Sequence, residues 1–172
     1  SWLGDVVDVE RMRLIVKEIV CAYCALHIVI NNAGINTGGG RLPIHEFDVA
    51  QWDRIVEVDL KGVFSVSRAA VPALLQSGEG RVVNISSIAG LVPLRLQSAF
   101  VAAKAGVINL TRSMALELGP QVILVNAVAP GSTLTRGTDQ LFYGPDGSYS
   151  ENAQRLLSHI PLGRPGRVEE IA

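Results

Sequence analysis

Residues 81–106, RVVNISSIAGLVPLRLQSAFVAAKAG, decide the fold class of this chain. The segment 81–85 is a short apolar, β-branched run of the kind that a buried parallel strand shows, and a polar break that includes Ser87 follows it. The chain then turns into a helix, in which Phe100 and Lys104 are four residues apart and share one face. A hydroxyl group, an aromatic ring and an ammonium group are therefore predicted to converge at the carboxyl end of a strand.

The composition favours an α/β protein. The chain has 172 residues, of which 48% are hydrophobic and only 5% aromatic, and it contains 17 glycines. A chain of this length can bury a sizeable core and matches the usual size of one domain. Its richness in Val, Ile, Leu and Ala is typical of parallel sheets that are covered on both faces. We therefore expect a single domain over residues 1–172.

The charge pattern and the apolar runs exclude two classes of partner. The net charge is −1, and the Lys and Arg residues are scattered instead of forming the basic stripe of a nucleic-acid-binding surface. The longest apolar runs fall well short of the roughly 18 to 20 residues that span a bilayer, and no signal-peptide pattern opens the chain. We expect a soluble, cytoplasmic protein with neither a nucleic-acid nor a membrane partner.

The two cysteines, Cys21 and Cys24, form a C-x-x-C pattern. A redox pair of this type lies at a helix N-terminus, whereas this pair lies near the end of a helical pattern, just before a strand. Zinc would need two further ligands at matching spacing, and the three histidines, His27, His45 and His159, are scattered. We therefore predict no metal site and interpret the cysteines as structural.

Further strands and helices follow from the periodicity of apolar residues. Short β-branched runs predict strands at residues 27–30 and 122–128. Apolar residues three or four apart predict a helix that Asp8 caps, a long helix from Asp48 onward, and a third helix at residues 98–118. These strands and helices agree with the α/β class.

Three local signals predict where helices bend, end or begin. Pro72 marks a bend in the long helix. The pair Gly119-Pro120 predicts the end of the following helix, because glycine tolerates a positive φ and proline lacks an N–H group. Ser148 and Glu151 have the spacing of a capping box for a later helix.

A second polar strand end follows the strand at 27–30. In open α/β sheets, ligands bind outside the carboxyl ends of the strands, where small residues allow a close approach. The run Asn31-Asn32-Ala33-Gly34 suits that use. The next segment, residues 35–43, is rich in glycine but lacks the Lys-Ser/Thr of a phosphate-binding loop, so Gly38, Gly39 and Gly40 are interpreted as flexible.

These motifs together resemble the short-chain dehydrogenase/reductase family. In that family a Ser precedes a Tyr-x-x-x-Lys helix by thirteen residues, and Ser87, Phe100 and Lys104 match the spacing, with Phe in place of Tyr. The Asn-Asn-Ala-Gly run and the turn at residues 129–135, APGSTLT, resemble two further family segments. The resemblance implies a Rossmann-like fold: a doubly wound parallel sheet in a three-layer α/β/α arrangement.

The resemblance also implies the site and its ligands. The catalytic positions would be Ser87, Phe100 (in place of Tyr), Lys104 and Asp59 (in place of Asn). The positions that bind NAD or NADP would be Asp5, Val6, Asn32, Ala33, Gly34, Lys104, Pro130, Gly131, Thr133 and Thr135. The implied substrate is a small alcohol or ketone, and the implied assembly is a homodimer or homotetramer.

Asp59 departs from the family pattern, because an ionised carboxylate only accepts hydrogen bonds, whereas an amide also donates them. It either pairs with Lys104 or lies on a helix surface. Phe142 and Tyr143 present a similar choice: they line a substrate pocket under a lid, or they pack beneath a loop.

Two functions remain open. One is an NAD(P)-dependent oxidoreductase whose activity is reduced because Phe100 has no hydroxyl to exchange a proton with the substrate. The other is a catalytically silent member of the family that serves as a binding or oligomerisation module. The family's glycine-rich cofactor loop and its last strand have no counterpart in these 172 residues, so we expect a partial copy that binds cofactor weakly by itself.

Overall fold

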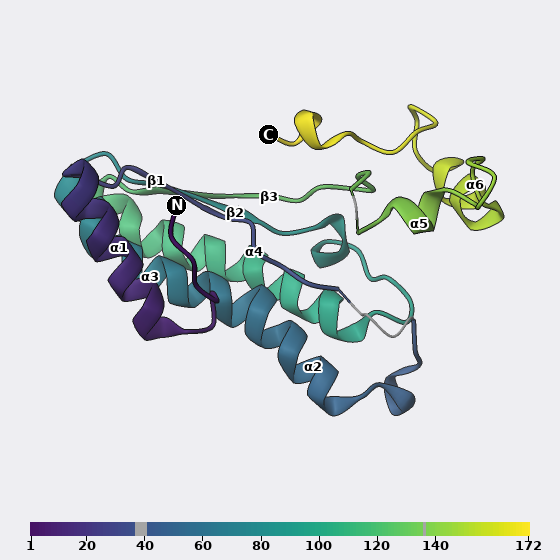
Figure 1. Ribbon diagram of the computed structural model, residues 1–172, viewed down its shortest axis with the longest axis horizontal. Helices are drawn as coiled ribbons and strands as arrows, with labels where there is room; N and C mark the ends of the chain where they lie inside the picture. Colours follow the sequence, from purple (N-terminus) through teal and green to yellow (C-terminus); the bar gives the residue numbers. More distant parts are fainter. Residues whose placement is uncertain (37–40, 136) are drawn as a thin grey trace. The chain divides into compact units, whose positions relative to one another are not determined.

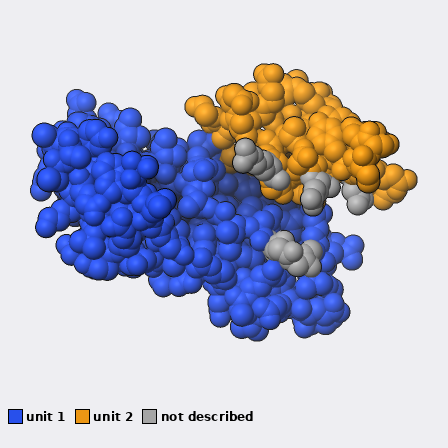
Figure 2. Space-filling model, viewed as in Figure 1, with its two compact units in different colours: residues 1–129 blue, residues 130–172 orange. Residues whose placement is uncertain are grey.

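The computed structural model describes residues 1–36, 41–135 and 137–172. They form two compact units, Ser1–Ala129 and Pro130–Ala172, which are shown in separate colours in Figure 2. The expectation of one domain over residues 1–172 stays a prediction. The predicted flexibility of Gly38, Gly39 and Gly40 lies outside the described residues.

The first unit contains a parallel three-stranded sheet in the order β1-β2-β3. Its strands are β1 (Ile28–Asn31), β2 (Arg81–Ile85) and β3 (Leu124–Val128). The prediction for β2 is confirmed residue for residue, whereas β1 is shifted by one residue. β3 begins two residues later than predicted, since Val122 has a φ of 62° and belongs to a turn.

Three long helices lie on one side of this sheet: α1 (Val9–Tyr23), α3 (Gly62–Ser77) and α4 (Ser98–Leu118) (Figure 1). α3 connects β1 to β2 and α4 connects β2 to β3, as in the crossover connections that join parallel strands. The predicted cap of α1 is confirmed, because the Asp8 carboxylate accepts a hydrogen bond from the Arg11 amide at 2.9 Å.

The predicted long helix consists of α2 (Val49–Val56), a π-helical turn (Glu57–Lys61) and α3. Its departure from α-helical geometry therefore precedes Pro72, which lies within α3. Such π-helical turns insert an extra residue into a helix and are frequent at functional sites. This one contains Asp59.

The core of the first unit lies between the sheet and the three helices. Its strands alternate, so Val29, Val82 and Val125 face the helices, where Leu74 and Met114 are among their neighbours. The other face of the sheet carries apolar side chains that remain exposed, from 37% for Val128 to 61% for Ile30. The predicted fold class, doubly wound and Rossmann-like, is confirmed, and the first unit supplies the sheet and one helical layer of the three-layer α/β/α arrangement.

The C-terminal end of α4 corrects one detail of the sequence analysis. The helix stops at Leu118, as predicted, and a 3₁₀ turn (Gly119–Gln121) follows. However, Gly119 has a right-handed φ of −55°, and Val122 is the residue with a positive φ. The stop signal was placed correctly, but glycine's tolerance of positive φ is not what ends this helix.

The second unit contains the short helices α5 (Asp139–Phe142) and α6 (Glu151–Leu157). Its core is formed by Phe142, Ala153 and Leu157. The predicted capping box is wrong: Ser150 caps α6 by accepting a hydrogen bond from the Ala153 amide at 3.1 Å, and the Ser148 hydroxyl donates to Asp146. Within the described ranges, no helix is both long and apolar enough to cross a membrane.

Candidate active site

A buried ion pair joins the π-helical turn to α4. The Lys104 ammonium lies 3.2 Å from the Asp59 carboxylate, and the residues are 6% and 0% exposed. The ammonium also donates a hydrogen bond to the Ile85 carbonyl at 3.3 Å, at the end of β2. It lies 5.6 Å from the centre of the Phe100 ring, so an ammonium and an aromatic ring converge at this strand end, as the sequence predicts.

Asp59 is held from its other side by the segment that follows β1. Its Oδ1 accepts a hydrogen bond from the Ile35 amide at 2.7 Å. Burial raises the pKa of the Asp59 carboxyl above its ordinary value, and the Ile35 amide and then the Lys104 ammonium oppose that rise. Of the two interpretations of Asp59, the ion pair with Lys104 is confirmed and the exposed helix surface is wrong.

Gly34 has the small size that this packing needs. A Cβ at position 34 would lie 3.3 Å from both the Asp59 Oδ2 and the Lys104 Nζ atoms. A side chain there would press on both charged groups of the pair. The Asn-Asn-Ala-Gly run therefore ends in glycine because a buried ion pair lies directly beside the backbone.

Ser86 and Gly90 hold the end of β2 close to α4, and Ser87 caps the short turn that follows the strand. The Ser86 hydroxyl donates to the Lys104 carbonyl at 2.8 Å. The Ser87 hydroxyl accepts from the Ala89 amide at 3.1 Å and caps a 3₁₀ turn (Ile88–Gly90). A Cβ on Gly90 would lie 2.7 Å from the Lys104 carbonyl, so the two backbones approach closely. The sequence pattern predicted a role for Ser87, whereas the contact of Ser86 with α4 was not predicted.

A buried chain of polar side chains supports the same sheet edge, and the sequence analysis did not find it. The Asn31 amide group donates to Ser67 of α3 at 3.1 Å and to Asn84 of β2 at 2.8 Å. Asn84 in turn donates to Thr111 of α4 at 2.9 Å, and Thr111 donates to the Val107 carbonyl at 2.7 Å. Asn84, which lies between the apolar residues Val83 and Ile85 of the strand, was the available signal for this network.

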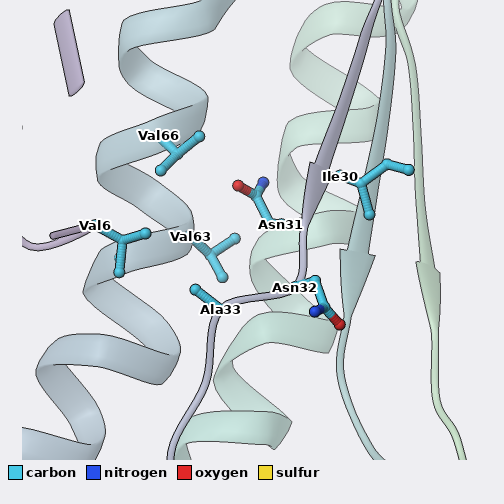
Figure 3. Close-up of a pocket in the computed structure, with 8 residues that line it drawn as sticks. Val6, Ile30, Asn31, Asn32, Ala33, Val63 and Val66 are labelled. Atoms are coloured by element: carbon cyan, nitrogen blue, oxygen red, sulfur yellow. The ribbon is translucent and has the colours of Figure 1, made fainter. Parts of the chain in front are cut away.

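A small pocket of about 150 Å³ opens beside β1 and α3 (Figure 3). The side chains of Asn31 and Asn32 point in different directions in this view, and the Asn31 side chain joins the buried network. Three of the predicted cofactor positions, Val6, Asn32 and Ala33, line this pocket. The pocket is lined by Val6, Ile30, Asn31, Asn32, Ala33, Gly62, Val63 and Val66.

A wider depression of about 520 Å³ shares Val6 and Ala33 with that pocket. It also includes Asp5 and Gly34, so it brings together four of the predicted cofactor positions. Arg54 of α2 lines it as well, and no motif in the sequence selected that residue. The lining residues are Gly4, Asp5, Val6, Ala33, Gly34, Ile35, Arg54 and Val58.

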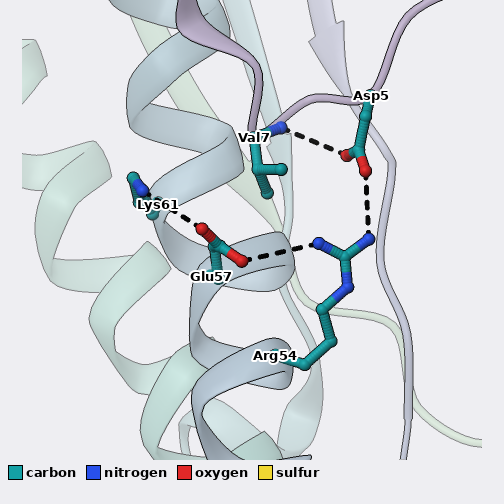
Figure 4. A network of polar contacts seen from close by, with 5 residues as sticks. All are labelled: Asp5, Val7, Arg54, Glu57 and Lys61. Carbon is teal, nitrogen blue, oxygen red and sulfur yellow. Dashed lines mark hydrogen bonds and ion pairs between the residues drawn. The ribbon is translucent and has the colours of Figure 1, made fainter.

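Asp5 belongs to a chain of polar contacts along this depression (Figure 4). Its carboxylate accepts hydrogen bonds from Arg54 at 3.0 Å and from the Val7 amide at 3.2 Å. Arg54 also donates to Glu57, which accepts a second bond from Lys61. The Arg54 guanidinium, and then the Val7 amide, hold the pKa of the Asp5 carboxyl below its ordinary value.

The remaining predicted cofactor residues, Pro130, Gly131, Thr133 and Thr135, belong to the second unit. There the Thr138 hydroxyl donates to the Thr133 carbonyl at 2.8 Å, and the same oxygen accepts from the Thr135 amide at 2.8 Å. The Thr138 hydroxyl thus connects the backbones of Thr133 and Thr135.

The aromatic residues of the second unit pack under a loop. Phe142 is buried in the core of that unit. The rings of Tyr143 and Tyr149 stack with their centres 5.1 Å apart. The packing interpretation of Phe142 is confirmed, and this side chain is not available as a pocket wall.

Cys21 and Cys24 are free and exposed at the end of α1. Cys24 is the C-cap residue, with a φ of 67°, so the pair lies at the helix C-terminus and not at an N-terminus that would favour a thiolate. Among the residues that the structure describes, no group of three His, Cys, Asp or Glu side chains could hold a metal ion.

Comparison with known proteins decides the family. A family model described as short chain dehydrogenase matches residues 1–145. The chain belongs to the short-chain dehydrogenase family.

Curated relatives of this family cover nearly the whole chain. It is 37% identical over 169 residues to the 3-oxoacyl-(acyl-carrier-protein) reductase FabG of Staphylococcus aureus, covering 98% of this chain and 65% of that protein. It is 41% identical over 168 residues to trans-4-hydroxycyclohexanecarboxylate dehydrogenase of Sinomonas cyclohexanicum, covering 98% of this chain and 59% of that protein. The chain therefore spans about two thirds of these relatives or less.

A solved structure shows the same fold. The gluconate 5-dehydrogenase of Burkholderia cenocepacia, in complex with NADP and tartrate, superposes with a TM-score of 0.88 at 28% identity. The match covers 98% of this chain and 63% of that protein. The parallel sheet with its crossover helices is thus the short-chain dehydrogenase fold.

Proposed function

We propose that this chain is part of an NAD(P)-dependent oxidoreductase that interconverts a small alcohol and a ketone, with proton transfer weakened or absent. The observation that carries the proposal is the position of Lys104. Its ammonium is buried between Asp59 and the Phe100 ring at the carboxyl end of β2. Gly34, which lines the adjoining depression, lies directly beside that ion pair.

The residues around the depression suit a dinucleotide. Ala33 and Gly34 leave room for a ligand against the backbone, and the Asp5 carboxylate can accept a hydrogen bond from an amino group. The similar gluconate 5-dehydrogenase is in complex with NADP, which supports NAD or NADP as the cofactor. Such a cofactor would supply the hydride, and the chain would supply binding and orientation. The proposed binding residues are Asp5, Val6, Asn32, Ala33, Gly34, Lys104, Pro130, Gly131, Thr133 and Thr135.

Phe100 is the reason for the proposed loss of activity. A phenol at this position would carry an exchangeable proton with an ordinary pKa of about 10, and general acid–base catalysis contributes about 10² to 10⁴-fold in rate. A phenyl ring carries no such proton. Ser87 retains a hydroxyl that can meet a substrate oxygen once it leaves the Ala89 amide. The chain thus keeps residues for binding and lacks the group for proton transfer.

A catalytically silent module is the second candidate. It is favoured by Phe100 together with exposed apolar side chains on the outer surfaces of α3 and α4, among them Phe64 and Leu116. Exposed apolar surface of this kind suits an interface between copies of the chain. A homodimer or homotetramer, and a cytoplasmic location, belong to the proposal in either form.

The proposal is tested by titrating the chain with NADH and with NADPH and following nicotinamide fluorescence. We expect weak but saturable binding of one of them. Ala33→Leu fills the depression and should weaken binding about tenfold or more, whereas Ala50→Leu on the exposed surface of α2 should leave it unchanged. An absence of saturable binding with both cofactors would overturn the oxidoreductase proposal in favour of the silent module.

A further inference from the structure

We infer that Asp59 is a positioning residue that neutralises Lys104, so that a hydroxyl-bearing ring at position 100 would keep its proton at neutral pH. On this view Asp59, as well as Phe100, keeps the site without a group that accepts a proton from an alcohol at neutral pH. The inference deepens the proposed function, on which its catalytic meaning rests. The electrostatic statement itself concerns only groups of this chain.

The Lys104 ammonium has a counter-ion within the chain itself, the Asp59 carboxylate. The ammonium and the Asp59 carboxylate are 3.2 Å apart, and both residues are shielded from water. The remaining polar partners are the Ile85 carbonyl on the ammonium and the Ile35 amide on the carboxylate. Across the described residues, Asp59 is the only carboxylate that forms an ion pair with Lys104. The net charge of this enclosed group is therefore zero.

The consequence for position 100 follows from charge. An unpaired ammonium within about 4 to 6 Å of an acid lowers its pKa by about 1 to 3 units, because it stabilises the anion. The Lys104 ammonium is 5.6 Å from the centre of the Phe100 ring, so a hydroxyl carried by a ring at this position would lie in the neighbourhood of the ammonium. A carboxylate 3.2 Å from the same ammonium opposes that effect, because it repels the anion that the ammonium attracts.

The pairing is part of the packing and not a loose surface contact. Asp59 lies on the π-helical turn and is fixed by the Ile35 amide, while Gly34 leaves the room that the ion pair occupies. Lys104 is fixed by the contact between its own carbonyl and Ser86. Both charged side chains are thus held facing each other by backbone contacts on either side.

The test is a spectrophotometric titration of the phenol that Phe100→Tyr introduces. The ultraviolet absorbance of ionised phenol is recorded against pH for Phe100→Tyr and for Phe100→Tyr/Asp59→Asn. Each curve is corrected with its Phe100 parent, so that Tyr23, Tyr143 and Tyr149 cancel. We expect the pKa of the new phenol to be about 1 to 3 units lower in the protein that also carries Asp59→Asn. Equal midpoints in the two proteins would overturn the inference.

A second variant covers the case in which Asp59→Asn does not fold. In Phe100→Tyr/Asp59→Asn/Lys104→Met both charges of the pair are removed together, and apolar replacements of buried pairs are often neutral for stability. The group is again neutral, so the pKa of the phenol should change by less than about half a unit. A rise of about one unit or more would show that Lys104 acts as an unpaired charge and would refute the inference. Neither titration needs cofactor or turnover, so each result is independent of the cofactor-binding test.

Discussion

The ammonium of Lys104 and the carboxylate of Asp59 form an ion pair across α4 and the π-helical turn, and both are buried. Removing one member of such a pair leaves an uncompensated charge in the interior, which typically costs about 3 to 5 kcal/mol. We therefore expect Asp59→Asn to lower the free energy of unfolding by roughly that amount. Urea unfolding followed by circular dichroism measures the change.

Two control variants separate this effect from a general loss of charge. Asp53→Asn removes an exposed carboxylate of α2 and should change the stability by less than about 0.5 kcal/mol. The double variant Asp59→Asn/Lys104→Met removes both charges and should recover most of the loss, since apolar replacements of buried pairs are often neutral. If Asp59→Asn alone proves as stable as the parent, the ion pair between Asp59 and Lys104 is not formed in solution.

Phe100→Tyr should restore part of the activity, and it should raise ketone reduction more than alcohol oxidation. A neutral phenol can give its proton to a ketone oxygen, so reduction should rise by about 10²-fold or more in the longest form of the protein that can be expressed. Alcohol oxidation needs the ionised phenol as the proton acceptor, so at neutral pH it should gain most in Phe100→Tyr/Asp59→Asn. Steady-state consumption or production of NADPH and NADH measures both directions. A Phe100→Tyr enzyme with bound cofactor and no gain in either direction would contradict the role assigned to position 100.

The sequence predicted the parts of the site that depend on local pattern. The strand at 81–85, the helix at 98–118 and the Asp8 cap follow from apolar spacing and capping chemistry, and all three are present. Phe100 and Lys104 share a face because they are four residues apart, which any helix enforces.

Contacts between distant segments were harder to predict. Arg54 meets Asp5 across 49 positions of sequence, and Asn31 meets Asn84 across 53. No local rule reports such pairs, because they depend on how helices pack on the sheet. Asp59 was predicted only in part. The family resemblance drew attention to the residue, but the fold was needed to show that it points inward to Lys104.

Gly90 should be intolerant of a side chain. A Cβ there would lie 2.7 Å from the Lys104 carbonyl carbon and oxygen, and backbone cannot move aside as a flexible side chain can. We expect Gly90→Ala to destabilise the protein by about 1 to 3 kcal/mol, as overpacking does. Thermal unfolding of Gly90→Ala and of the parent measures this loss of stability.

Gly119→Ala is the matched control for that experiment. Position 119 has a helical φ of −55°, and a Cβ added there would have no atom within 4 Å, so alanine should be neutral or stabilise by about 0.4 to 1 kcal/mol. Equal effects of the two substitutions would mean that the end of β2 does not approach α4 as closely as described.

The ionisation of Glu170 is expected to make the stability of the second unit depend on pH. Its carboxylate accepts two hydrogen bonds from Arg164, at 2.9 and 2.8 Å, and one from the Arg167 amide at 2.7 Å. These contacts, with Arg164 the largest, lower the pKa of Glu170 from an ordinary 4.5 to about 2. A lowered pKa means that the folded unit favours the ionised form, so the stabilisation is complete above about pH 4.5 and is lost as the pH falls towards 2.

Comparison of the parent with Glu170→Gln measures this contribution. The parent should show greater amide protection from hydrogen exchange in the second unit at pH 6, and the difference should shrink between pH 4.5 and 2. Glu169→Gln removes the neighbouring exposed carboxylate and should leave protection unchanged at both ends of the range. A direct NMR titration of the Glu170 side chain should have its midpoint near pH 2. A midpoint near 4.5 would instead show that the carboxylate is free in solution and that Arg164 does not hold this turn.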